Sequence, residues 1–122
     1  MTQAHVVREF PADPASVALL LAGPSAASLW PDIADDSTMV SVGPPMRSGV
    51  GFVVDLTVTE AVGSIRGRLS LVPYGGGPTP VGGTSARLLL TGTQASASTL
   101  RECGGGFLDM LSSLAVARST AA

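Results

Sequence analysis

A run of strictly alternating residues in the middle of the chain most limits what this sequence can fold into. In residues 49–59, every second position is apolar: Val50, Phe52, Val54, Leu56 and Val58. The positions between them include Asp55 and Thr57. Successive side chains of a strand point to opposite faces of its sheet. The run therefore predicts a strand with one face in a core and the other in water, as is typical of antiparallel sheets.

Four further segments have the composition of strands: residues 4–10, 38–42, 65–73 and 84–93. In residues 65–73, Leu69 and Leu71 share one predicted face, whereas Arg66 and Arg68 share the opposite face. Strands therefore fill most of the middle of the chain, and they follow one another without long helical segments between them.

A loop rich in glycine and proline separates the last two of these strands. Residues 75–83 contain five glycines and two prolines. Such a segment cannot bury enough apolar surface to be held firmly. We therefore expect a mobile loop that gates the entrance to a binding site.

Helices are expected near the start of the chain. Asp13 is a favourable N-cap before Pro14, and a helix that begins there ends at Gly23 and Pro24. Ser25 can cap a second short helix that continues to Leu29 and is ended by Pro31.

The final twenty residues or so also have helical spacing. An apolar stripe follows a cap at Ser96 or Ser98 and consists of Leu100, Cys103, Phe107, Leu111 and Leu114. Residues 104–106 are three consecutive glycines, each of which costs a helix about 1 kcal/mol relative to alanine. Either the helix begins only at Phe107, or these glycines let its backbone lie close to the sheet or to a ligand.

The composition favours a binding cavity or a subunit interface. The 122 residues fit one domain, residues 1–122. Hydrophobic residues make up 45% of the chain and charged residues 13%, against about 25% charged residues in an ordinary soluble domain. Some apolar residues are therefore expected to be exposed, to line a cavity, or to lie between the subunits of a homodimer.

Charge and hydropathy exclude two classes of partner. The formal net charge is −2, the chain has no lysine and its arginines are scattered, which argues against nucleic acid. No apolar run approaches the roughly 20 residues of a membrane span, and the N-terminus has no signal-peptide pattern. We therefore expect a cytoplasmic protein.

The residue types also narrow the chemistry. Schiff-base catalysis needs a lysine, and a single cysteine with a single histidine makes no structural zinc site. A catalytic triad would have to use His5, which lies on a predicted strand. We expect no metal and no cofactor. An enzyme with this composition would depend on carboxylates, arginines, hydroxyls, Trp30 and Tyr74.

Three motifs stand near the start of the chain: FPADPASV at 10–17, LLL at 19–21 and LWP at 29–31. By these motifs and by the order of its elements, the chain resembles the START-like, Bet v 1-like superfamily, and within it the actinobacterial polyketide cyclase and aromatase proteins. The rest of the chain agrees only in the order of its elements. The resemblance implies an α+β helix-grip fold, in which an antiparallel sheet curves around a C-terminal helix, here with fewer strands than usual.

The resemblance also implies a function. It suggests a protein that binds a hydrophobic, aromatic or polycyclic small molecule and acts as a cofactor-free cyclase or dehydratase on a polyketide-like substrate. Two alternatives remain open: a non-catalytic carrier of a lipid or metabolite, and a small homodimer whose extra apolar surface is its interface.

The expected ligand-binding residues come from the apolar faces of strands and helix. We predict a continuous surface that faces the C-terminal helix and is lined by Phe52, Val54, Leu56, Leu69, Leu71, Phe107 and Leu111. The resemblance places Trp30 near the cavity mouth, where it can stack on a planar substrate. The alternative is that Trp30 only packs the helix pair against the sheet.

Arg68, Arg66 and Tyr74 are the catalytic candidates. Some cyclases of the family have a strand arginine that points into the cavity and stabilises a substrate enolate or carbonyl. We favour Arg68 over Arg66 for this role, because Arg68 lies nearer the middle of its predicted strand. Alternation places both on the polar face, where pairing across strands with Asp55 or Glu60 is the alternative. Tyr74 ends a strand and can donate a hydrogen bond to a ligand oxygen, or it is a plain turn residue.

Overall fold

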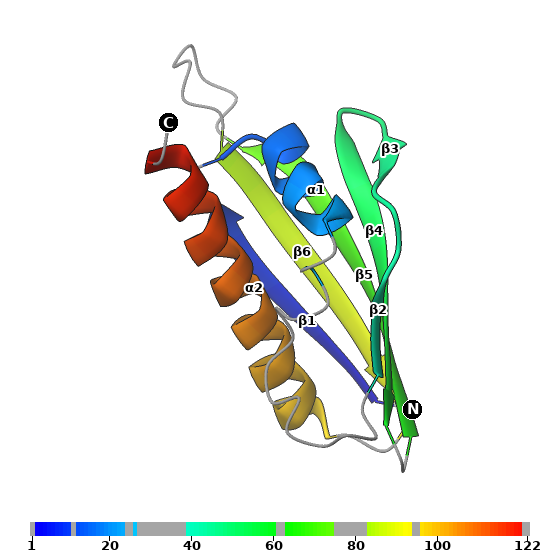
Figure 1. Ribbon diagram of the computed structural model, residues 1–122. Coiled ribbons are helices and arrows are strands. Elements are labelled where there is room, and N and C mark those ends of the chain that lie inside the picture. Colours follow the sequence, from blue (N-terminus) through cyan, green and yellow to red (C-terminus); the bar gives the residue numbers. More distant parts are fainter. Residues whose placement is uncertain are drawn as a thin grey trace.

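The alternating segments form one antiparallel sheet with two helices on one of its faces (Figure 1). The computed structural model describes residues 2–10, 12–23, 26, 39–60, 63–74, 83–93 and 96–120. Within these ranges there are six strands: β1 (Thr2–Phe10), β2 (Met39–Val42), β3 (Met46–Ser48), β4 (Gly51–Glu60), β5 (Gly63–Tyr74) and β6 (Gly83–Gly92). The helices are α1 (Pro14–Ala22) and α2 (Ala97–Thr120).

The order of the strands places the first strand of the chain beside the last one described. It is β1-β6-β5-β4-β2, and β3 pairs with β4 beside β2. The strands β4, β5 and β6 follow one another directly, whereas β1 pairs with β6, the last strand described. This is an α+β fold whose open antiparallel sheet and C-terminal helix fit a helix-grip-like architecture, as predicted.

One face of the sheet, here called the inner face, carries both helices and the core. The predicted alternation is confirmed: Val54 on β4 is opposite Leu69 on β5, which in turn is opposite Leu88 on β6, and all three are buried. Val6 and Phe10 of β1 complete the same layer. The helix α2 packs on β1 and β6, and α1 packs on β4, β5 and β6.

The predicted strand over residues 49–59 is wrong at its start. Gly49 has a φ of 59°, a left-handed conformation that suits glycine, and it forms a tight turn with Val50. The turn folds β3 back onto β4, so that Arg47 is opposite Phe52. Val50 is 76% exposed instead of facing the core. The apolar side chain of Val50 extended the alternation by chance.

The helix α1 begins and ends where the sequence predicts. Pro14 occupies its first turn and Gly23 follows its last residue. Asp13 is at the N-cap position, but its side chain accepts a hydrogen bond from the Ser16 hydroxyl instead of from a helix N–H. The predicted second helix is outside the described residues apart from Ala26, and so are Trp30 and residues 75–82 of the predicted gating loop.

The helix α2 passes through the three glycines without a break. The Ser96 Oγ accepts a hydrogen bond from the Thr99 N–H at 3.2 Å, as expected of an N-cap. A Cβ atom on Gly104 would lie 2.9 Å from Leu90 Cδ1 and 3.2 Å from Val6 Cγ2. Of the two explanations for the glycines, close approach of the helix to the sheet is therefore the correct one. Neither described helix has the length and hydropathy of a membrane span.

Candidate functional site

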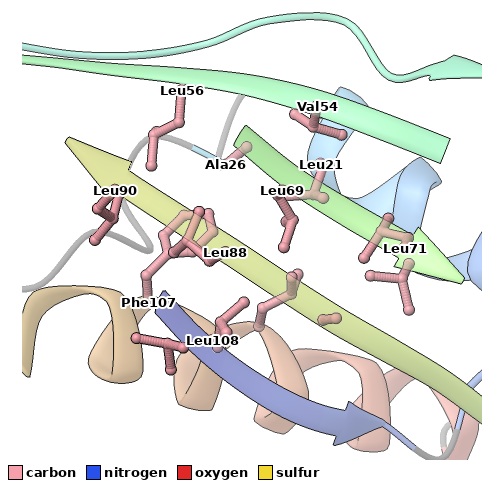
Figure 2. Packing of buried hydrophobic residues seen from close by; sticks show 14 of the residues in the cluster. Leu21, Ala26, Val54, Leu56, Leu69, Leu71, Leu88, Leu90, Phe107 and Leu108 are labelled. Carbon is pink, nitrogen blue, oxygen red and sulfur yellow. The ribbon is translucent and has the colours of Figure 1, made fainter. Parts of the chain in front are cut away.

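The predicted lining residues meet on the inner face, in the register that the alternation implied. Figure 2 shows side chains from β4, β5 and β6 on the face of the sheet that carries α1 and α2, and Phe107 directed from α2 toward the sheet. Six of the seven are at most 3% exposed: Val54, Leu56, Leu69, Leu71, Phe107 and Leu111. These six pack in one hydrophobic core. Their role in ligand binding stays a prediction.

A strip of half-buried apolar side chains continues the core beyond the two helices. It consists of Val40, Val42 and Phe52, and we call it the inner strip. Val40 is opposite Val58 and Val42 is opposite Leu56, both of which face the core, so the strip shares their face. On the described residues of β2 and β4, the inner strip contains the apolar inner-face side chains that remain partly accessible.

The two candidate arginines are on the opposite face, which we call the outer face. Arg66 is opposite Thr57 and Arg68 is opposite Asp55, and all four residues are exposed. The Arg68 Nε donates to Asp55 Oδ1 at 3.3 Å, which is the cross-strand pair expected as the alternative. Because strand residues alternate between faces, neither arginine can face the buried leucines of the same strand.

Tyr74 is the remaining polar candidate. It is the last residue of β5, where it pairs with Gly83, and its side chain is outside the described part of the chain.

Two arginines that were not candidates share the face of the core. Arg8 lies between Val6 and Phe10 on β1, and its Nε donates to Asp109 Oδ1 of α2 at 3.2 Å. Its Nη1 also donates to the Val7 carbonyl at 3.0 Å. Arg47 is exposed on β3, in register with Phe52. The position of Arg8 follows from its alternation with Val6 and Phe10 along the strand, whereas the position of Arg47 depends on the turn at Gly49, which the sequence analysis did not predict.

The interior formed by the described residues contains few polar side chains. Its one buried polar side chain is Thr84, whose Oγ1 donates to the Ala12 carbonyl at 2.6 Å. In the part of the chain whose side chains are described, all six arginines are exposed, and no cluster of three or more metal-ligating side chains is found. The inner face therefore offers apolar contact, with Arg47 at the end of the inner strip.

The sheet and C-terminal helix define the class of fold, and two solved structures share it. No protein-family model matches the chain, and no curated protein matches it. The chain is similar to CV1439 of Chromobacterium violaceum, with 14% identity, a TM-score of 0.61, and coverage of 93% of this chain and 96% of that one. It is also similar to TTHA0849 of Thermus thermophilus, with 14% identity, a TM-score of 0.53, and coverage of 96% and 99%. At this identity the likeness extends to the fold alone.

Proposed function

We propose that the protein is a START-like carrier that binds a hydrophobic small molecule against the inner strip. The observation that carries the proposal is the position of Val40, Val42 and Phe52. They are apolar, they face the side of the sheet that holds the helices, and they keep part of their surface accessible. Ligand sites are lined mostly by apolar and aromatic side chains.

Binding without chemistry is the function that the described residues support best. A cyclase needs a group that stabilises negative charge or moves a proton beside the substrate. Thr84 is buried, but its hydroxyl donates to the Ala12 carbonyl. Arg66 and Arg68 are on the other face of the sheet. A carrier needs none of these groups, because apolar burial supplies its affinity.

The test is binding of Nile red, an uncharged hydrophobic dye, followed by its fluorescence. Phe52→Ala should raise the dissociation constant about 5- to 150-fold, since truncating an aromatic contact costs roughly 1–3 kcal/mol. Val7→Ala is the matched control, because Val7 is a partly exposed apolar residue on the outer face and lines no groove that the structure describes. Absence of saturable binding, or equal weakening in both variants, would overturn the proposal.

Arg47 favours a second candidate, a cofactor-free cyclase or dehydratase. Its guanidinium shares the inner face with Phe52 and can stabilise an enolate oxygen. With a polyketide-like substrate, Arg47→Gln should then lower kcat while Phe52→Ala raises KM. Trp30→Ala should weaken binding by roughly 1–3 kcal/mol if Trp30 stacks on the ligand, as the family resemblance suggests. No turnover by a chain that binds the substrate would leave the carrier as the function.

We further propose that the protein acts in the cytoplasm. A homodimer is the alternative to a ligand-binding monomer. The chain's apolar excess supports either a bound ligand or a covered interface. Native mass spectrometry separates the two, because it reports the mass of a co-purified small molecule and the number of subunits in one measurement.

A further inference from the structure

The outer face of the sheet carries a groove of its own. It crosses β4, β5 and β6 on the side opposite to α1 and α2, and its volume is about 550 Å³. That volume is within the range of small-molecule sites. The side chains that line it are Asp55, Thr57, Arg66, Arg68, Leu89 and Thr91.

The register divides these side chains into two parallel rows. Asp55, Arg68 and Leu89 are directly opposite one another on the three strands. Thr57, Arg66 and Thr91 form the next row. Residues two apart along a strand are separated by roughly 7 Å, so the groove is a slot between the rows.

The backbone of β5 forms the floor of this slot at Gly67. Gly67 lies between the two arginines and faces the core, where a Cβ atom would come 2.8 Å from Leu90 Cδ2 and 3.3 Å from Leu56 Cδ2. The strand thus lies unusually close to the core at this point. The outer groove is directly behind it.

The charge in the slot favours an anion. No hydrogen bond or ion pair joins the Arg66 side chain to any side chain that the structure describes, whereas the Arg68 Nε donates to Asp55 Oδ1 at 3.3 Å. Two guanidinium groups and one carboxylate leave a local excess of one positive charge, in a chain whose formal net charge is −2. A planar guanidinium binds a carboxylate or phosphate through two parallel hydrogen bonds, and it also stacks on flat rings.

We propose that this groove binds a small organic anion. Its carboxylate or phosphate group accepts hydrogen bonds from Arg66 and from the hydroxyls of Thr57 and Thr91. Its flat apolar part lies in the slot and packs against the Arg68 guanidinium and Leu89, whose side chain is partly exposed. The site is independent of the inner strip, because the two are on opposite faces of the sheet.

The test is a titration of ¹⁵N-labelled protein, followed by the amide resonances in two-dimensional NMR. The probes are phenyl phosphate, benzoate, inorganic phosphate and uncharged benzyl alcohol. Phenyl phosphate or benzoate should cause saturable shifts around Thr57, Gly67 and Thr91, and whichever binds more tightly identifies the anionic group. Inorganic phosphate should bind more weakly than phenyl phosphate, and benzyl alcohol should cause no saturable shift.

Arg66→Gln and Arg87→Gln form a matched pair of variants. Both remove one positive charge from an exposed outer-face residue, but Arg87 does not line the groove. Arg66→Gln should weaken binding of the preferred anion at least 5-fold, and Arg87→Gln should leave it within 2-fold. Thr57→Val with Thr91→Val should also weaken it, without a change in charge.

Three results would overturn the proposal. The first is the absence of saturable shifts with both organic anions. The second is equal weakening by Arg66→Gln and Arg87→Gln, which would indicate attraction by general charge alone. The third is a set of shifts confined to inner-face residues, which would assign the anion to the inner strip.

Discussion

Gly104 allows α2 to lie close to the sheet, because it has no side chain at the point of contact. Leu90, Val6 and Leu88 occupy the space that its Cβ would fill, at 2.9, 3.2 and 3.4 Å. Gly105, the next residue, would meet only Arg8 Nη2 at 3.1 Å, the far end of a flexible side chain. Two adjacent glycines of one helix therefore have opposite tolerance for a methyl group.

Replacing Gly104 by alanine should destabilise the protein by about 1–3 kcal/mol, because overpacking at the sheet outweighs the gain of about 1 kcal/mol in helix propensity. Gly105→Ala should be neutral or stabilising. Urea unfolding of both variants measures the difference. A Gly104→Ala protein as stable as Gly105→Ala would contradict the close approach.

Thr84 links the start of β6 to the segment that follows β1. Its hydroxyl donates to the Ala12 carbonyl, and Thr84 itself is fully buried. Thr84→Val should cost about 1–3 kcal/mol, since the valine cannot donate to that carbonyl. The exposed Thr59, changed to valine, is the control and should alter the free energy of unfolding by less than about 0.5 kcal/mol. Similar losses in both variants would count against the Thr84 hydrogen bond.

At the scale of elements, one ion pair ties α2 to β1. Arg8 and Asp109 keep side-chain exposures of 44% and 66%, so water screens their attraction. A double-mutant cycle with Arg8→Ala and Asp109→Ala should give a coupling energy below about 1 kcal/mol. The coupling should shrink further in about 1 M salt. A larger coupling energy that does not depend on salt would contradict this. It would mean that the ion pair, and not the apolar contacts, is the main attachment of α2 to β1.

The sequence predicted most elements because each has a local cause. Alternation identified β4 and β5, and the proline and glycine beside α1 fixed its ends. The hairpin of β3 and β4 was missed, because Val50 continued the apolar alternation while Gly49 adopted a left-handed conformation. The extent of α2 was left open, because helix propensity disfavours three glycines and only the contact of Gly104 with the sheet compensates for it.

The candidate site was harder to predict because it depends on pairing between distant segments. Alternation placed the seven lining residues on one face, but a pattern along one strand does not reveal how tightly the faces pack. Six of the seven belong to a packed core. The outer groove depends on the alignment of three strands, which no single segment specifies.

At the scale of the whole molecule, backbone amides should be best protected from hydrogen exchange in the middle of the sheet. β5 and β6 each have a paired strand on both sides, whereas all three residues of β3 are exposed. Amide hydrogen exchange should therefore be slowest in β5 and β6, near the rate set by global unfolding, and fastest in β3. Exchange measured by NMR in the native protein tests this order. Slowest exchange in β2 or β3 would contradict the sheet order.

The pairing of β1 with β6 has a consequence for how the chain folds during its translation. A nascent chain that has not reached residue 83 contains β1 through β5 but lacks the strand that β1 needs. The apolar residues Val6 and Phe10 must wait for the end of translation, while β4 and β5 can already pair as neighbours. Contacts between segments so distant along the chain form slowly. The strand β1 is therefore made first, but it pairs with its neighbour in the sheet later than β4 and β5 pair with each other.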